Sequence, residues 1–365
     1  MKNVVRVLAL MIFSAFILYL MSQWGLLKIG DIVLAFQHGK QWIFVIVVTQ
    51  LLLSFLLLFR YVCLLKVFKV DVHLQQASAA TFVSNAVGQW APGALAVIEF
   101  IRMGLMFGAK HKSDASLNSE RSLKMRLAAT SLFDRLLGFF TMLATGGICS
   151  AVLLALKWNE EIKTGHLIAL VLLTLFSLSG AVFIGLLPWM ARWKLTTHVL
   201  KLLSESHDSL AQNDSFKFKM MRVISKVSLK LETLRLEIVL GSQNLPDLIL
   251  PILASLGCLA ASSLSVYFAS CATGDRIELG AIFATYPIVA ISTLLPIGFG
   301  GMGGQQLVAV AIFGIFNLSG SAVASASLLQ NGLLLIENTL LGLLYAHLSA
   351  GQIKAIMTRR REAAE

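Results

Sequence analysis

The chain has 365 residues, of which 57% are hydrophobic and 13% charged, and its formal net charge is +11. Soluble domains are about 45–50% apolar and about 25% charged, so the composition excludes an ordinary soluble enzyme or binding module. The long apolar runs predict an all-α integral membrane protein, because a membrane β-barrel would show short segments of alternating polarity. The basic residues fall between the apolar runs, which indicates membrane topology and anionic headgroups rather than nucleic acid.

Eight apolar segments follow one another along the chain, at 4–22, 42–65, 77–107, 127–156, 166–190, 247–272, 279–316 and 323–348. Lys2 precedes the first segment and Arg6 lies near its start, which places the N-terminus in the cytoplasm. No small-residue cleavage pattern follows it, so we expect it to remain as the first span.

The charge of the loop 108–126 bears on the path of the segment before it. This loop holds five Lys/Arg against two Asp/Glu, but three simple crossings would place it outside, against the preference of basic loops for the cytoplasm. The conflict disappears if 77–107 is a re-entrant hairpin, broken at Pro92-Gly93, that enters and leaves on the cytoplasmic side. Two half-helices of roughly 20 Å each reach past mid-membrane without crossing it.

A second hairpin is predicted for 279–316. After segments 127–156 and 166–190 cross outward and back, the insertion 191–246 holds nine Lys/Arg against five Asp/Glu and is expected in the cytoplasm. Its basic amphipathic part predicts a helix on the inner leaflet, or else a solvated connecting helix.

Once segment 247–272 has crossed outward, a hairpin turning at 296–304 would bring the chain back, so that the basic tail 351–365 lies in the cytoplasm. The predicted fold is therefore a membrane domain, 1–350, with six full spans and two re-entrant helical hairpins, about eight membrane segments arranged as an inverted repeat. The alternative is eight plain, kinked spans.

The turn of the second hairpin has the sequence LPIGFGGMGGQQ, residues 295–306. It matches G-x-G-x-x-G, but no soluble strand precedes it and no acidic residue lies between Gly303 and Glu337, which argues against a nucleotide site. The glycines could instead allow close helix packing. Broken backbone at membrane depth needs burial in protein or a wet cavity, and its amide groups can hold a phosphate. The candidate substrate-binding residues here are Pro296, Gly300, Gly301, Gly303 and Gln305.

The first hairpin contributes polar and ionisable candidates. Glu99 and Arg102 are three residues apart, so they share a helix face and can pair. Ionisable residues inside an apolar run suggest function, although Arg102 could simply extend to the membrane surface with Glu99 as its counter-charge. The other candidates of this hairpin are Asn85, Gln89, Trp90, Pro92 and Gly93.

Asp134 and Arg135 lie inside segment 127–156. Adjacent residues diverge by about 100° on a helix, so each needs a partner elsewhere. The candidates are Arg102 for Asp134 and Glu99 for Arg135, either as structural ion pairs or as part of a site. Arg60, near the cytoplasmic end of 42–65, is a further basic candidate.

Glu337 also lies deep in an apolar run and forms a polar stripe with Gln330, Asn331 and Asn338. It could face a cavity, bind a cation or proton, or serve polar packing between helices. The cysteines and histidines show no metal-ligand spacing, so neither a metal nor another cofactor is expected.

Three of these motifs resemble one family, in order and spacing and over nearly the whole chain. LPIGFGGMGGQQ resembles the Pro-x-x-x-Gly-Gly-x-Gly-x-x-Glu signature of the lysylphosphatidylglycerol synthase transmembrane (flippase-like) family. FDRLLG resembles its Asp-Arg-x-x-Gly segment, and APGALAVIEFIR its Pro-Gly…Glu-x-x-Arg segment. Two features depart from the family: Gln305 or Gln306 stands where a carboxylate is usual, and two extra residues separate Pro92 from Glu99.

The sequence does not contain the soluble aminoacyl-transferring domain of full-length synthases, so the resemblance implies the lipid-handling half. We therefore expect a lipid translocator, rather than an enzyme, in the bacterial cytoplasmic (inner) membrane. It would carry an anionic phospholipid or a polyprenyl-phosphate-linked glycolipid, with Arg60, Arg102 and Arg135 neutralising the phosphate.

Three other functions stay open. They are an integral membrane glycosyl or lipid transferase with Glu99 or Asp134 as general base, an accessory protein of envelope-glycan biosynthesis, and a small-solute transporter. Partners other than membrane lipids would be a second copy of the chain or proteins of that pathway.

Overall fold

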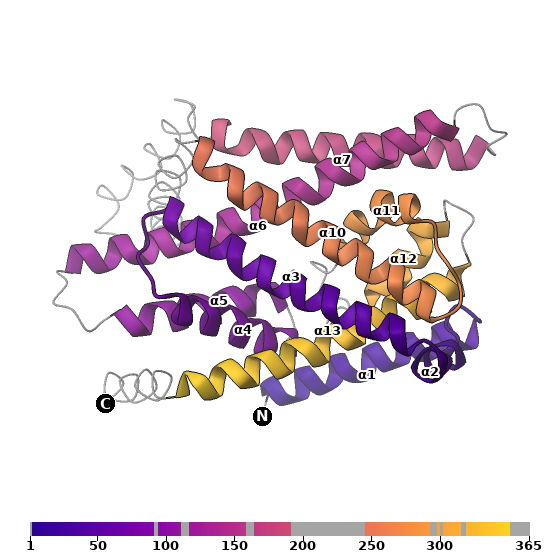
Figure 1. The fold of residues 1–365 in the computed structure, drawn as a ribbon, viewed down its shortest axis with the longest axis horizontal. Helices are drawn as coiled ribbons and strands as arrows, with labels where there is room; N and C mark the ends of the chain where they lie inside the picture. Colours follow the sequence, from indigo (N-terminus) through magenta and orange to yellow (C-terminus); the bar gives the residue numbers. More distant parts are fainter. Residues whose placement is uncertain are drawn as a thin grey trace, which may run out of the picture.

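The computed structural model describes residues 2–90, 94–110, 117–157, 164–190, 245–292, 298–299, 302–314 and 319–350. Almost all of these residues are helical (Figure 1). Four described segments are long and apolar enough to cross a membrane, namely Lys40–Val67, Leu123–Leu156, Pro246–Ala272 and Gly320–Leu348. The prediction of a multi-pass helical membrane protein is therefore confirmed at this level.

The long helices are α1 (Lys2–Gln23), α3 (Lys40–Val67), α6 (Leu117–Lys157), α7 (Thr164–Met190), α10 (Ile249–Ala272) and α13 (Gly320–Leu348). A short 3-10 turn, η2 (Leu245–Leu248), leads into α10. Each long helix covers one predicted apolar segment. The insertion 191–246, except for its last two residues, and the tail 351–365 lie outside the described residues.

The two segments predicted to be hairpins are each a pair of short helices. Segment 77–107 consists of α4 (Leu74–Gln89) and α5 (Ala94–Lys110), which pack against each other. Segment 279–316 contains α11 (Leu279–Ile291) and α12 (Gly304–Phe313). At 1.5 Å per residue these helices are about 15–26 Å long, short of a hydrocarbon core of about 30 Å.

The breaks fall where the sequence predicts them, although the turn residues themselves are not all described. Pro92, Gly93, Pro296, Gly300 and Gly301 lie outside the described residues. In the second break, β1 (Gly298–Phe299) pairs antiparallel with β2 (Met302–Gly303), with Gly298 opposite Gly303. Gly303 has φ +88°, a conformation that favours glycine.

The order long helix, two short helices, long helix occurs twice. It runs first through α3, α4, α5 and α6, and again through α10, α11, α12 and α13. Helices α3 and α10 pack side by side and run in opposite directions, and the two short pairs lie toward opposite ends of the molecule (Figure 1).

Helix α2 (Ile29–His38) was not predicted from the sequence. Its ten residues are too few to span a membrane, so the region reads as a loop by hydropathy alone. Ala35 is fully buried and packs with Ala269, Ala272 and Leu329, so α2 covers the ends of α10 and α13.

The contact between α4 and α13 depends on a glycine. A Cβ added at Gly342 would overlap the Cβ of Ala86 and lie 3.1 Å from the carbonyl oxygen of Phe82. Beside it the rings of Phe82 and Tyr345 pack with centroids 4.6 Å apart. Small residues at such crossings let membrane helices approach closely.

Gly342→Ala is therefore expected to destabilise the protein by about 1–3 kcal/mol, the usual cost of overpacking. Gly332→Ala on the same helix is the matched control, because no atom lies within 4 Å of a Cβ placed there. Thermal unfolding of the detergent-purified variants measures the difference. Equal melting temperatures for the two variants would contradict the close crossing.

Candidate functional site

A cavity of about 310 Å³ lies among the broken helices and the long helices around them. It is lined by residues of α3, α4, α5, α6, α10, α11, α12 and α13, so both short pairs contribute to its wall. The polar lining residues are Ser54, Arg60, Asn85, Gln89, Asp134, Arg135, Thr141, Ser255, Ser262, Tyr286, Gln305, Asn331 and Asn338. Six of the residues proposed from the sequence are therefore brought to one place.

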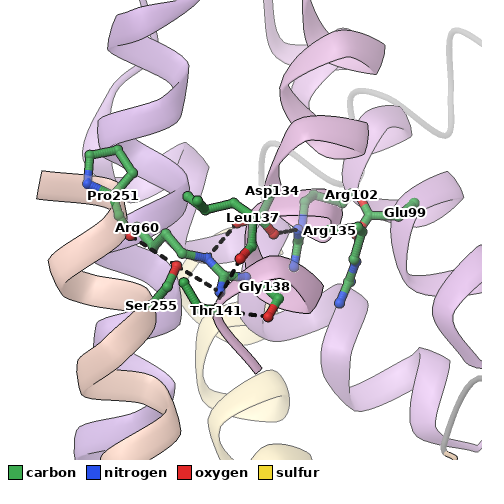
Figure 2. Close-up of polar contacts among 10 residues, drawn as sticks. All are labelled: Arg60, Glu99, Arg102, Asp134, Arg135, Leu137, Gly138, Thr141, Pro251 and Ser255. Atoms are coloured by element: carbon green, nitrogen blue, oxygen red, sulfur yellow. Dashed lines mark hydrogen bonds and ion pairs between the residues drawn. The ribbon is translucent and has the colours of Figure 1, made fainter. Parts of the chain in front are cut away.

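Asp134 of α6 is held by two arginines. Arg60 Nε donates to its Oδ1 at 2.7 Å, and Arg102 Nη1 lies 3.6 Å from its Oδ2. Arg60 Nη1 also donates to Ser255 Oγ at 3.4 Å (Figure 2). Arg60, Arg102 and Asp134 are at most 5% exposed, and charges this deeply buried are tolerated only when they are paired.

Gly138 lies beside the Arg60 guanidinium that pairs with Asp134, which accounts for a small residue at this position of the Asp-Arg-x-x-Gly segment. Gly138 lies one helical turn after Asp134, on the same face of α6. A Cβ added at Gly138 would be 3.4 Å from Arg60 Nη1, so a larger side chain would push the guanidinium away from its carboxylate.

Glu99 of α5 connects the other two arginines. Arg102 Nη1 donates to Glu99 Oε1 at 3.2 Å, and Arg135 Nε donates to the same oxygen at 2.7 Å, with Arg135 Nη2 as a second donor. Arg102 also lies over the ring of Tyr61, 4.6 Å from its centroid, a cation–π geometry. The predicted pairs Glu99–Arg102, Arg102–Asp134 and Glu99–Arg135 are confirmed.

The charges form a chain in the order Arg60, Asp134, Arg102, Glu99 and Arg135. Three guanidinium groups thus face two carboxylates, so the chain carries one positive charge in excess. The side chain of Arg135 is 26% exposed, against 6% and 5% for Arg60 and Arg102. Arg135 is therefore the arginine best placed to meet a ligand in the cavity.

The part of the cavity wall formed by α12 and α13 is polar but neutral. Asn331 Nδ2 donates to Gln305 Oε1 at 2.9 Å, which joins α13 to the first turn of α12. The neighbouring residue, Gln306, is fully buried, and its Oε1 accepts the amide N–H of Gly303 at 2.6 Å. Gln305 thus faces the cavity, whereas Gln306 caps α12.

Trp90 and Glu337, two further residues proposed from the sequence as substrate-binding, lie beside the cavity rather than in its wall. Trp90 Nε1 donates to Thr339 Oγ1 at 3.2 Å, which connects the end of α4 to α13. Glu337 contacts the cavity through Ser54, whose Oγ donates to Glu337 Oε1 at 2.9 Å. In the described part of the chain, no three His, Cys, Asp or Glu side chains are placed to bind a metal ion together.

Sequence reasoning missed the serines of the site and the main partner of Asp134. Ser54 and Ser255 lie inside apolar runs, where small hydroxyl residues commonly bond their own helix backbone, as Ser255 does with the carbonyl of Pro251. Arg60 was recognised as a basic candidate, but its pairing with Asp134, 74 residues away, needs the packing of α3 on α6.

Asp134→Ala is expected to destabilise the fold by about 3–5 kcal/mol, because Arg60 stays buried without its carboxylate. The double variant Arg60→Leu/Asp134→Leu should lose less, since no charge is left unpaired. Asp275→Ala, in the exposed loop before α11, serves as the control. Melting temperatures in detergent give the order of stability of the variants. A double variant less stable than Asp134→Ala would contradict the ion-pair explanation.

Comparison with known proteins agrees with the resemblance seen in the motifs. No curated protein and no solved structure gives a match to the chain. The family model for the lysylphosphatidylglycerol synthase TM region matches residues 6–342, which include every residue that lines the cavity. The chain therefore belongs to the lysylphosphatidylglycerol synthase TM region family, which suggests a lipid-related function in a membrane.

Proposed function

We propose that the protein is a lipid translocator that moves an anionic phospholipid or a polyprenyl-phosphate-linked glycolipid across the bacterial cytoplasmic membrane. The observation that carries the proposal is the cavity lined by both pairs of short helices, whose wall holds an excess guanidinium charge together with neutral amide side chains. Both substrate classes carry a phosphate, the group that arginine binds best through two parallel hydrogen bonds.

The phosphate would be held at Arg135. This side chain reaches the cavity and is bound by the Glu99 carboxylate through Nε and Nη2. Both nitrogens donate to the single oxygen Oε1, and phosphate oxygens can accept from the same two nitrogens, so a phosphate can take the place of Glu99 at Arg135. Glu99 would then remain paired with Arg102. Arg135 would always have a negative partner, either the Glu99 carboxylate or the phosphate.

The proposal includes a membrane topology, namely which end of the molecule faces the cytoplasm. Several helix ends lie toward one end of the molecule, the end of α4 and α5 (Figure 1). These helix ends are followed by the connections 111–116 and 191–244 and by the tail after α13. The loop 108–126 holds five Lys/Arg against two Asp/Glu, the insertion 191–246 nine against five, and the tail 351–365 four against two, which favours the cytoplasm for this end and for both termini. The two short pairs would then be re-entrant from opposite faces, as halves of an inverted repeat.

Cysteine labelling tests this topology. In a background without Cys63, Cys149, Cys258 and Cys271, single cysteines at Asp71 and Ser113 flank the α4–α5 pair, and one at Asp275 precedes α11. A re-entrant pair predicts that positions 71 and 113 react from the cytoplasm and position 275 from outside. Labelling of 71 and 113 from opposite faces would show that this segment crosses the membrane.

Transport is tested by reconstitution into liposomes with fluorescent phosphatidylglycerol and a short-chain polyprenyl-phosphate sugar. We expect leaflet exchange of at least one lipid, loss of most of it in Arg135→Ala, and partial recovery in Arg135→Lys, which keeps the charge but not the two-pronged geometry. Lys66→Ala is the matched control, because this exposed basic residue of α3 lies outside the cavity.

Mass spectrometry of the same vesicles separates translocation from transfer. Exchange without a new covalent product supports the translocator. A new product dependent on Glu99 or Asp134 would instead indicate a transferase, and full exchange in Arg135→Ala would contradict the phosphate site.

A further inference from the structure

Glu337 lies near the middle of α13, 7% exposed, and takes no part in the ion-pair chain. Its Oε1 accepts the hydrogen bond from Ser54 Oγ of α3. Its Oε2 is buried and has no hydrogen-bond partner among the described residues. A buried carboxyl oxygen without a donor is unusual, because each such group loses its hydration without replacement.

The side chains next to Glu337 are neutral. One turn from Ser54 on α3, Gln50 Nε2 donates to the backbone carbonyl of Gln330 at 2.8 Å, so α3 and α13 are joined by two polar contacts in succession. The nearest cationic residue along α3 is Arg60, six residues or about 9 Å from Ser54, and it is bound to Asp134.

No other ionisable group of the packed helices is a described partner of Glu337. Helices α4 and α12, which pack on α13, contain no ionisable side chain. The remaining ionisable residues on the elements around α13 are Lys2, Arg6 and Tyr19 of α1, Asp31 and His38 of α2, Lys40, Tyr61, Cys63 and Lys66 of α3, Cys258, Tyr267 and Cys271 of α10, Tyr286 of α11, and Tyr345 and His347 of α13 itself. Within the described residues, Glu337 is therefore a carboxyl group without a counter-charge.

Ser54 gives this carboxyl group access to the cavity. The serine is itself a lining residue, and a hydroxyl can donate and accept at once. In an apolar environment, a carboxyl group without a paired cation is more stable in its protonated, neutral form than as a carboxylate. A proton from cavity water can thus reach Glu337 through the Ser54 hydroxyl.

We propose that Glu337 is a proton-binding site that exchanges with the cavity through Ser54, and that its protonation is coupled to the movement of the lipid headgroup. The coupling rests on the proposed function, whereas the proton site does not. The step is a simple uptake, in which the carboxylate and one proton form a carboxylic acid. The acid can donate to Ser54 Oγ, so the contact between α3 and α13, two walls of the cavity, changes with the proton.

Infrared difference spectroscopy tests the site without any transport. Spectra of the purified protein in acidic minus alkaline buffer should contain a carbonyl band from a buried carboxylic acid. Glu337→Gln should lose this band, whereas Asp275→Asn, which removes an exposed carboxyl group, should keep it. A band unchanged in Glu337→Gln, or no band in the wild type, would overturn the proton site.

Ser54→Ala covers the case in which Glu337→Gln does not fold. It retains the carboxyl group but removes its hydrogen bond, so the band should shift in frequency, and an unshifted band would also count against the site. Repeating the titration with sodium in place of choline decides the identity of the cation. Suppression of the band by sodium would overturn the proton in favour of a sodium ion.

Coupling is tested in the liposomes with fluorescent phosphatidylglycerol. Exchange should be severalfold faster with a pH gradient in one orientation than in the other, and Glu337→Gln should abolish this difference. Wild-type exchange that is equal in both orientations would overturn the coupling while leaving the translocator intact. Absence of exchange in the wild type would overturn the translocator and the coupling together, and the infrared titration would still decide the proton site.

Discussion

The arrangement of the site depends on a single buried carboxylate, Asp134, which is shared by arginines from two other helices. A charge at this depth is stable only if its partners are held in place, so α3, α5 and α6 must keep their relative positions for the chain of charges to exist. Gly138 contributes by leaving space for the guanidinium of Arg60. The exposed end of the chain, Arg135, is where a ligand can compete with a protein carboxylate, because its side chain is only partly buried.

The two halves of the molecule use the same order of helices for different chemistry. The helices of the first half supply the five residues of the ion-pair chain together with Asn85 and Gln89, whereas α12 and α13 supply Gln305, Asn331 and Asn338 and the isolated Glu337. A phosphate and an uncharged headgroup could thus be accommodated side by side. A small number of polar groups placed in a pocket is typical of sites that orient their ligand.

Much of this architecture could be predicted from the sequence, since it follows from local rules. Clustered proline and glycine disfavour a continuous helix, and the loop charges predicted two broken segments, each of which contains a pair of short helices in the structure. The spacing of Glu99 and Arg102, and the divergence of Asp134 from Arg135, identified three of the ion pairs. The Arg60–Asp134 pair, the lining serines and α2 were not predicted, because they depend on which helix faces pack together, and apolar runs in lipid have no polar face to indicate this.

The capping of α12 bears on the difference between this chain and the family signature. Counted from Pro296, the carboxylate position of the signature falls on Gln306, whose Oε1 accepts the N–H of Gly303. An amide oxygen serves this hydrogen bond as well as a carboxylate oxygen does, so the backbone turn is kept. A carboxylate there would also neutralise the positive end of the dipole of α12, whereas glutamine leaves it uncompensated. The wall around Gln305 therefore has a more positive electrostatic potential than it would have with glutamate at position 306, which disfavours a cationic group beside it.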